Sequence, residues 1–269
     1  MICKLRKKHK KKLLSLLNNY PYNNIFLIGH LYERDIDYPG LNYWGYFENG
    51  YLRSVLMEFC KRYICVFSLD LNFSEEFVFL LKNIIDKKET EYISGDIITI
   101  VNLLEKVSSI SDKEYYCRYE QHNFCLLDNK KFKPIIKNKV KKATIKDLDK
   151  LIEFYKNAQH MDRSEQEIRE NLKYNRIIIA ELDNVIVSSA LTNTETPSIG
   201  ILGGIYTKPE YRSQGFSISC VSKLCMDLLN NKKEVCLFYN INDPITHNFY
   251  SKLGFNKIGD WIVVKIENQ

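Results

Sequence analysis

One segment limits the fold of this chain more than any other, the run from Ile205 to Ser217. Its apolar start predicts a strand, Pro209 predicts a turn, and Gly215 lies in a loop that opens a long helix over residues 216–230. The backbone N–H groups of such a loop converge on one point, and the helix N-terminus adds about half a positive charge. The segment therefore predicts an anion site between a strand and a helix.

The familiar phosphate-binding motifs do not account for this loop. No Gly-Lys-Ser/Thr follows it, which excludes a Walker loop, and G-x-G-x-x-G is absent, which weighs against a dinucleotide site. Gly215 permits a close backbone approach, and Arg212 adds a mobile cation. The loop is therefore expected to bind phosphate through a different motif.

The elements around this segment alternate between strand and helix. Residues 140–143 predict a strand, Thr144 caps a helix, and Ser164 with Glu167 forms a capping box that opens another helix over 164–174. Further strands are expected over 177–182, 185–190, 199–206, 234–239 and 261–266, with helices over 216–230 and from Pro244 to Gly254. The order β-α-α-β-β-β-α-β-α-β indicates an α/β (α+β) fold with a mixed, mostly antiparallel sheet flanked by helices.

The loop and a second block downstream resemble a known family. Arg212-x-x-Gly215-x-Ser217 is similar to the R/Q-x-x-G-x-G/A signature of the GNAT superfamily, the acyl-CoA-dependent N-acyltransferases, and its lead-in over 206–211 is similar too. Further on, the run from Phe249 to Phe255 resembles the Y-x₃-G-F block of that family. Two blocks in register, each in the expected helix and strand context, are far more specific than a single short motif.

This resemblance implies roles for individual residues. Splayed central strands would hold acyl-CoA, with backbone groups pairing with the pantetheine arm and loop amides holding the pyrophosphate. Tyr250 would lie near the sulfur and protonate the leaving thiolate, and no metal is implied. The implied cofactor-binding residues are Ile205, Tyr206, Thr207, Arg212, Ser213, Gln214, Gly215, Phe216, Ser217 and Asp243.

The sequence also departs from the family pattern. Ser217 stands where Gly or Ala is usual, and Asp243 stands where Asn is frequent, so its charge would either repel phosphates or recruit the amine. The strand over 199–206 holds no Asp or Glu, the usual source of a general base. The remaining base candidates are Glu181, Glu195 and His247, each of which is also explained as a solvated residue, and proton loss through water is equally open.

The resemblance is weaker in the first half of the chain. The opening over 13–31 and the hairpin around Asn49-Gly50 look like the degenerate GNAT-like half of two-domain GNAT proteins. No R-x-x-G-x-G/A block occurs in residues 1–130, so this half is expected to lack its own CoA site.

A lysine-rich connector over 129–139 marks the expected boundary between the halves. We therefore expect a degenerate GNAT-like N-terminal domain over residues 1–133 and a GNAT N-acetyltransferase domain over residues 134–269.

The net charge and the cysteines indicate which partners and which cell compartment to expect. Net charge is +6, and much of the excess lies in residues 4–12, where no aromatic side chain is interleaved to stack bases. We therefore favour the solvated start of a helix over a nucleic-acid tether. The eight cysteines form no C-x-x-C pair and several lie in apolar runs, which indicates buried free thiols in a reducing cytoplasm. Neither a signal peptide nor a membrane span is expected.

These observations favour an N-acetyltransferase of class EC 2.3.1 that uses acetyl-CoA as donor and a primary amine of a small molecule or peptide as acceptor. The alternative is a non-catalytic acyl-CoA-binding protein that has kept the phosphate loop and lost the base. The resemblance implies that variable loops over 158–163 and 192–198, with the N-terminal half, shape the acceptor side. No membrane or nucleic-acid partner is expected, and a homodimer is left open.

Overall fold

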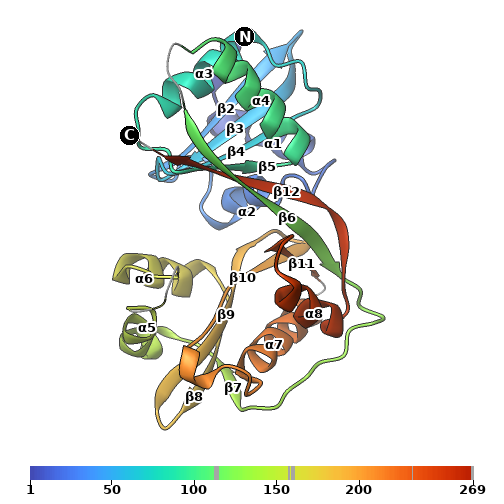
Figure 1. Cartoon of the computed structure of the whole chain (residues 1–269). Helices are drawn as coiled ribbons and strands as arrows, with labels where there is room; N and C mark the ends of the chain where they lie inside the picture. Colours follow the sequence, from blue (N-terminus) through green and yellow to red (C-terminus); the bar gives the residue numbers. More distant parts are fainter. Residues whose placement is uncertain (112–114, 157, 159–160, 232, 268–269) are drawn as a thin grey trace. The chain divides into compact units, whose positions relative to one another are not determined.

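The computed structural model of the chain describes residues 1–111, 115–156, 158, 161–231 and 233–267. The chain forms two compact units (Figure 1). The first comprises Met1–Asn123 and Gly259–Gln269, and the second comprises Phe124–Ile258. These differ from the expected ranges of 1–133 and 134–269, because the end of the chain returns to the first unit and the lysine-rich connector belongs to the second.

Both stretches of the chain carry the same order of elements, β-α-α-β-β-β-α-β-α-β, as predicted for the second stretch. The first order is β1 (Ile2–Lys4), α1 (Lys10–Leu17), α2 (Ile25–Glu33), β2 (Leu41–Glu48), β3 (Tyr51–Phe59), β4 (Tyr63–Ser68), α3 (Glu75–Ile85), β5 (Tyr92–Gly95), α4 (Ile97–Ser109) and β6 (Tyr116–Leu127). The second is β7 (Val140–Lys142), α5 (Leu148–Tyr155), α6 (Glu165–Tyr174), β8 (Ile177–Leu182), β9 (Val185–Glu195), β10 (Ile199–Thr207), α7 (Phe216–Asn230), β11 (Glu234–Asn240), α8 (Pro244–Leu253) and β12 (Phe255–Glu267). The predicted α/β fold with a mixed, mostly antiparallel sheet is confirmed.

The strands of the two units share a pattern of pairing. In the first unit β1 to β4 pair antiparallel, β4 pairs parallel with β5, and β5 pairs antiparallel with β12. In the second unit β7 to β10 pair antiparallel, β10 pairs parallel with β11, and β11 lies beside β6. The last strand of each repeat thus completes the sheet of the other unit.

Helices cover both faces of each sheet, which explains why the strands are rich in buried apolar residues. In the second unit α7 and α8 pack on one face over a core that includes Leu202, Leu224 and Leu237. Helices α5 and α6 pack on the other face over a separate core that includes Leu151 and Ile179 (Figure 1). The first unit likewise has α3 and α4 on one face and α1 and α2 on the other.

Several turns and helix ends form at the positions that local sequence signals predicted. Asn49 and Gly50 turn the β2–β3 hairpin with φ values of 50° and 80°, both in the left-handed region. Ser164 accepts from the Glu167 amide in a capping box that opens α6. Gly254, at φ 99°, ends α8. These signals work because each depends only on residues a few positions apart.

The N-terminal segment combines an expected and an unexpected feature. A short 3₁₀ turn over Lys7–His9 leads into α1, so the basic stretch is the start of a helix, as favoured. Residues Ile2–Lys4 form a strand that the sequence did not predict, with Ile2 in register with Tyr46 of β2. Three residues carry no recognisable periodicity, and only the partner strand makes them a strand.

The eight cysteines are free, and five of them are buried: Cys65, Cys125, Cys220, Cys225 and Cys236. Among the described residues, no helix combines the length and apolarity needed to cross a bilayer.

Candidate functional site

Strands β10 and β11 separate halfway along their length. Their parallel register covers Ile199–Leu202 and Glu234–Leu237, although β10 continues to Thr207 and β11 to Asn240. The register of β10 with β9 is irregular between Gly203 and Tyr206, and Gly204 adopts φ 53°. This bulge marks the point where β10 turns away from β11. Beyond it, the backbone of β10 offers an edge on which an extended ligand can pair.

The predicted pantetheine-binding residues Ile205, Tyr206 and Thr207 lie on this edge. The Tyr206 ring is buried against Phe154, with ring centroids 5.4 Å apart. The side chain of Tyr206 therefore belongs to the core, and its main chain is the part that a ligand can reach.

The loop after β10 forms a concave set of backbone amides. Ser213 and Gly215 both adopt left-handed conformations, with φ values of 63° and 82°, and Gly215 is the N-cap of α7. The first amide of this helix with a partner among the described residues is that of Ser219, which donates to the Gly215 carbonyl at 3.2 Å. The amides of residues 216–218 lie at the positive end of a long helix without a partner among the described residues, an arrangement that suits a phosphate group.

The connector holds this loop in place. The Ser219 hydroxyl donates to the Gly215 carbonyl at 2.8 Å and accepts from the Lys137 and Asn138 amides at 2.9 and 3.1 Å. The Asn138 side chain donates to the Gln214 carbonyl at 3.1 Å. A Cβ built on Gly215 would lie 2.8 Å from Cδ of Lys137. Glycine is thus favoured by its left-handed backbone angle, and the Lys137 side chain of the connector packs against it.

Arg212 brings a positive charge to the loop. Its Nε donates to the Thr207 carbonyl at 3.2 Å, which places the guanidinium between the end of β10 and the start of α7. Arg212 is exposed and forms no ion pair within the part of the chain that the structure describes. The side chain is therefore free to meet an anionic ligand.

Tyr250 lies in α8, on the sheet face that α7 also covers. It is 7% exposed, and its ring lies 5.1, 5.6 and 5.8 Å from those of Phe249, Phe255 and Tyr239. Burial raises the pKa of Tyr250 well above its ordinary value, with further increases from Cys225 and Asp243. The phenol therefore keeps its proton at neutral pH, as a hydrogen-bond donor must.

Two of the base candidates are held in ion pairs. Glu181 pairs with Lys141 and Lys150 at 3.0 Å each, and although burial raises its pKa, the bonds from these lysines outweigh it and lower the pKa overall. Glu195 lies 2.9 Å from Arg176. The lowered pKa makes the Glu181 carboxylate a poor proton acceptor.

His247 and Asp243 both lie at the start of α8. His247 is exposed, and its Nδ1 is 2.7 Å from the hydroxyl of Tyr239, whose ring contacts Tyr250. The carboxylate of Asp243 caps α8 by accepting from the amide and hydroxyl of Thr246. The capping role explains an acid at this position, and contact of Asp243 with the cofactor stays a prediction.

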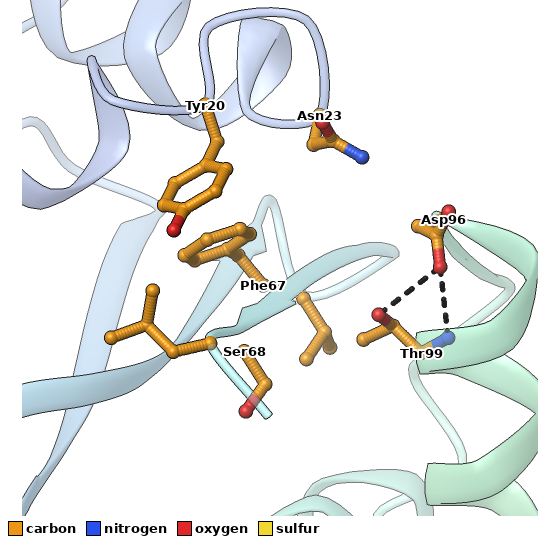
Figure 2. A pocket seen from close by; sticks show the side chains of 8 residues that line it. Tyr20, Asn23, Phe67, Ser68, Asp96 and Thr99 are labelled. Atoms are coloured by element: carbon orange, nitrogen blue, oxygen red, sulfur yellow. Dashed lines mark hydrogen bonds between the residues drawn. The ribbon is translucent and has the colours of Figure 1, made fainter. Parts of the chain in front are cut away.

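The first unit has a counterpart of the strand opening. The β4–β5 pairing covers Tyr63–Cys65 and Tyr92–Ser94 and then ends, and a pocket lies beyond it (Figure 2). The residues that line it are Tyr20, Asn23, Val66, Phe67, Ser68, Leu69, Asp96 and Thr99.

Two helix starts of the first unit, those of α3 and α4, are acidic, in contrast to that of α7. Asp96 caps α4 by accepting from the amide and hydroxyl of Thr99 (Figure 2). Helix α3 begins with a Ser74 cap followed by Glu75 and Glu76. The Asp96 carboxylate completes the start of α4 internally, and the negative charges of Glu75 and Glu76 at the start of α3 would repel a phosphate. The lack of a CoA site in the first half stays a prediction.

Comparison with known proteins identifies the fold. A family model described as FR47-like protein matches residues 184–263. No curated protein matches the sequence. Among solved structures, a Drosophila protein is similar at 11% identity and a TM-score of 0.73, over 99% of this chain and 98% of that chain.

Two further structures are similar over the whole length. A GNAT-family acetyltransferase from Colwellia psychrerythraea has 12% identity and a TM-score of 0.61, covering 100% of both chains. A tandem GNAT protein from the clavulanic acid biosynthesis pathway has 11% identity and a TM-score of 0.65, over 99% of this chain and 98% of that chain. The chain therefore has the two-domain GNAT fold, as its motifs predicted.

Some residues around the site gave no motif signal. Ser219, Lys137 and Asn138 support the loop that opens α7, yet they come from a helix interior and a connector more than 75 positions away. The serines at positions 219 and 222, on the otherwise apolar side of α7, were the available sign, since buried hydroxyls require partners.

Proposed function

We propose that the protein is an N-acetyltransferase that transfers the acetyl group of acetyl-CoA to a primary amine. The observation that carries this proposal is the opening between β10 and β11, which lies directly before a loop of unpaired amides at the start of α7. The free edge of β10 suits an extended amide chain, and the loop amides suit a pyrophosphate. Together they match the two polar parts of CoA.

The donor would lie along β10. The backbone of Ile205, Tyr206 and Thr207 would pair with the pantetheine arm. Arg212 and the amides of residues 213–217 would hold the pyrophosphate, with Lys137 adding a second exposed cation beside Gly215. This arrangement fixes the thioester relative to Tyr250, because the phosphate end of the donor is anchored on the same face.

The reaction would be a direct transfer. The amine nitrogen attacks the carbonyl carbon of the thioester, a C–N bond forms, and the C–S bond breaks with its electron pair going to sulfur. The neutral Tyr250 hydroxyl donates to the developing thiolate, and the proton lost by the amine passes to water. The buried Tyr250 phenol is neutral, so its hydroxyl can donate a hydrogen bond to the sulfur.

The second candidate is a non-catalytic acyl-CoA-binding protein. It is favoured by one observation, that β10 supplies no carboxylate and both Glu181 and Glu195 are committed to ion pairs. Such a protein would bind CoA through the same loop without releasing thiol.

A thiol-release assay separates the two candidates. Acetyl-CoA is incubated with a panel of amines, amino acids, polyamines and aminoglycosides, and CoA affinity is measured separately by calorimetry. We expect thiol release with at least one acceptor, and Tyr250→Phe to lower kcat about 100-fold with little change in acetyl-CoA affinity. Acetyl-CoA binding without release across the panel would establish the non-catalytic alternative.

The phosphate-site assignment is tested by charge reversal. We expect Arg212→Glu to weaken acetyl-CoA binding by at least about 10-fold, because a cation beside the pyrophosphate becomes an anion. Arg169→Glu is the matched control, since Arg169 is an exposed arginine on α6 that pairs with Glu165 at 2.7 Å. Equal affinities of the two variants would refute the assignment.

A further inference from the structure

A second arginine lies beside the bulge of β10. Arg163 precedes α6, and its guanidinium carbon is 5.3 Å from the centre of the Tyr155 ring. A Cβ built on Gly204 would lie 3.0 Å from Nη2 of Arg163. The guanidinium therefore lies over β10 at the residue where this strand turns away from β11, in space that the absence of a side chain at Gly204 leaves open.

Buried hydroxyls hold the surface beneath this arginine. Tyr155 is 1% exposed, and its hydroxyl is 2.9 Å from that of Ser189 on β9. The Ser189 hydroxyl in turn donates to the Gly204 carbonyl at 3.5 Å. Burial raises the pKa of Tyr155, although the nearby Arg163 opposes the rise, so the phenol under the guanidinium is neutral. The chain thus offers Arg163 an aromatic face and neutral oxygens.

The charge of Arg163 lacks a carboxylate partner. Arg163 is half-buried, its Nε is fully enclosed without a hydrogen-bond acceptor, and it forms no ion pair within the ranges that the structure describes. Other half-buried arginines of the chain are paired: Arg34 lies 2.6 Å from Glu33, and Arg176 lies 2.9 Å from Glu195. A partly buried cation without an anion is costly, and a ligand anion would relieve that cost.

The position of Arg163 separates it from the phosphate loop. Helix α7, which begins at that loop, packs on one face of the sheet with α8. Tyr155 and Leu191, which surround the Arg163 guanidinium, belong to the core on the opposite face. An anion bound by Arg163 therefore reaches the bulge of β10 from the side opposite to the pyrophosphate.

We propose that Arg163 binds an anionic group of the acceptor, so that the acceptor is a primary amine that carries a carboxylate or a phosphate. The inference rests on the proposed acetyl transfer and names the acceptor class for the same site. The planar guanidinium would form two parallel bonds to the anion, while the Tyr155 ring holds the guanidinium from behind. The amine of the same molecule would then lie at the β10 bulge, where the acetyl group of the donor arrives.

Matched acceptors test this directly. Alanine, alaninamide and ethylamine share an amine and differ in the carboxylate, and O-phosphoethanolamine with ethanolamine makes the same comparison for a phosphate. We expect the wild type to use one of the anionic members at least 10-fold better, by kcat/KM for thiol release, than its uncharged counterpart. Arg163→Gln should lower kcat/KM for that acceptor about 10- to 100-fold and leave the neutral amines unchanged.

Two further variants guard against a structural explanation. Arg163→Lys should retain part of the preference because it keeps the charge, and the exposed Arg169→Gln should retain all of it. Affinity for acetyl-CoA should be the same in every variant, since Arg163 faces away from the phosphate loop.

The outcomes separate failure of this inference from failure of the proposed function. A wild type that uses alaninamide and ethanolamine as well as their anionic partners, or an Arg163→Gln variant that loses the same factor with every amine, overturns the inference while transfer stands. If no amine supports thiol release, the proposed function fails. The inference is then judged by calorimetry with N-acetylalanine and N-acetyl-O-phosphoethanolamine: binding of either that Arg163→Gln weakens at least 10-fold supports it, and any other result overturns it.

Discussion

A methyl group added at position 215 is a sharp test of how the phosphate loop is built. Gly215 has φ 82°, where a side chain costs about 1–2 kcal/mol. The new Cβ would also lie 2.8 Å from Cδ of Lys137, but this methylene belongs to a flexible exposed side chain and can move. We therefore expect Gly215→Ala to lower the free energy of unfolding by about 1–2 kcal/mol, nearly all of it from the backbone angle.

The effect on ligand binding should be larger than this strain alone explains. Relaxing the angle shifts the amides of residues 213–217 that are proposed to bind the pyrophosphate. Loss of one charge-assisted hydrogen bond corresponds to about 1.5–3 kcal/mol, so acetyl-CoA affinity should fall about 10- to 100-fold. Affinity is measured by calorimetry and stability by urea denaturation.

The hairpin glycine Gly50 supplies a matched control. It has φ 80°, nothing lies within 4 Å of a Cβ built on it, and it belongs to the first unit. Gly50→Ala should therefore be destabilised to a similar degree and bind acetyl-CoA as the wild type does. If Gly215→Ala shows the same loss of stability but unchanged affinity, the loop amides do not bind the donor and our reasoning is refuted.

Three further predictions concern support of the loop, alkaline pH and the returning strand. Ser219→Ala removes the hydroxyl that joins the connector to the loop, so stability should fall by about 2 kcal/mol and acetyl-CoA affinity several-fold, as measured by denaturation and calorimetry. Burial raises the pKa of Cys220 to about 12 and also raises the pKa values of Cys225 and Cys236, so the unfolded chain loses these protons first as pH rises. Urea-derived stability should fall above about pH 9, by up to about 1.4 kcal/mol per pH unit for each thiol. Val264 of β12 is 0% exposed in the core of the first unit, so Val264→Asp buries a charge there. Thermal melting should show that the free energy of unfolding falls by more than about 4 kcal/mol.

Each of these has its own control. Ser217→Ala, on the same helix but outside the connector contacts, should keep wild-type stability, and equal stability of Ser219→Ala would contradict the bridging role. Cys225→Ala should make the alkaline decline shallower, and an unchanged slope would count against the thiols as its cause. Lys265→Ala changes the exposed neighbour of Val264 and should leave the stability unchanged. Unchanged stability of Val264→Asp would show that β12 does not pair with the strands of the first unit.

Much of the fold could be predicted because its signals are local. The Asn49-Gly50 turn, the Ser164 capping box and the glycine that ends α8 act through backbone angles and hydrogen bonds between near neighbours. The loop that opens α7 was predicted in the same way, since strand, turn, glycine and helix follow one another within a single run from Ile205 to Ser217.

Contacts between distant residues were not readable from such signals. Nothing in the pattern around Arg163 showed that its charge lies over Gly204, a residue on a different element about 40 positions later. Side chains meet in such ways only after the strands and helices have packed.

By itself, therefore, the sequence determined the kinds of elements, their order and the loop that opens α7. Periodicity shows that a segment is a strand and which of its faces is buried, but the same alternation suits any neighbouring strand. Only the tertiary structure decided that β12 pairs with β5 of the first unit while β6 lies beside β11 of the second. That choice depends on long-range packing of apolar faces such as those of Ile262 and Val264, which no local signal encodes.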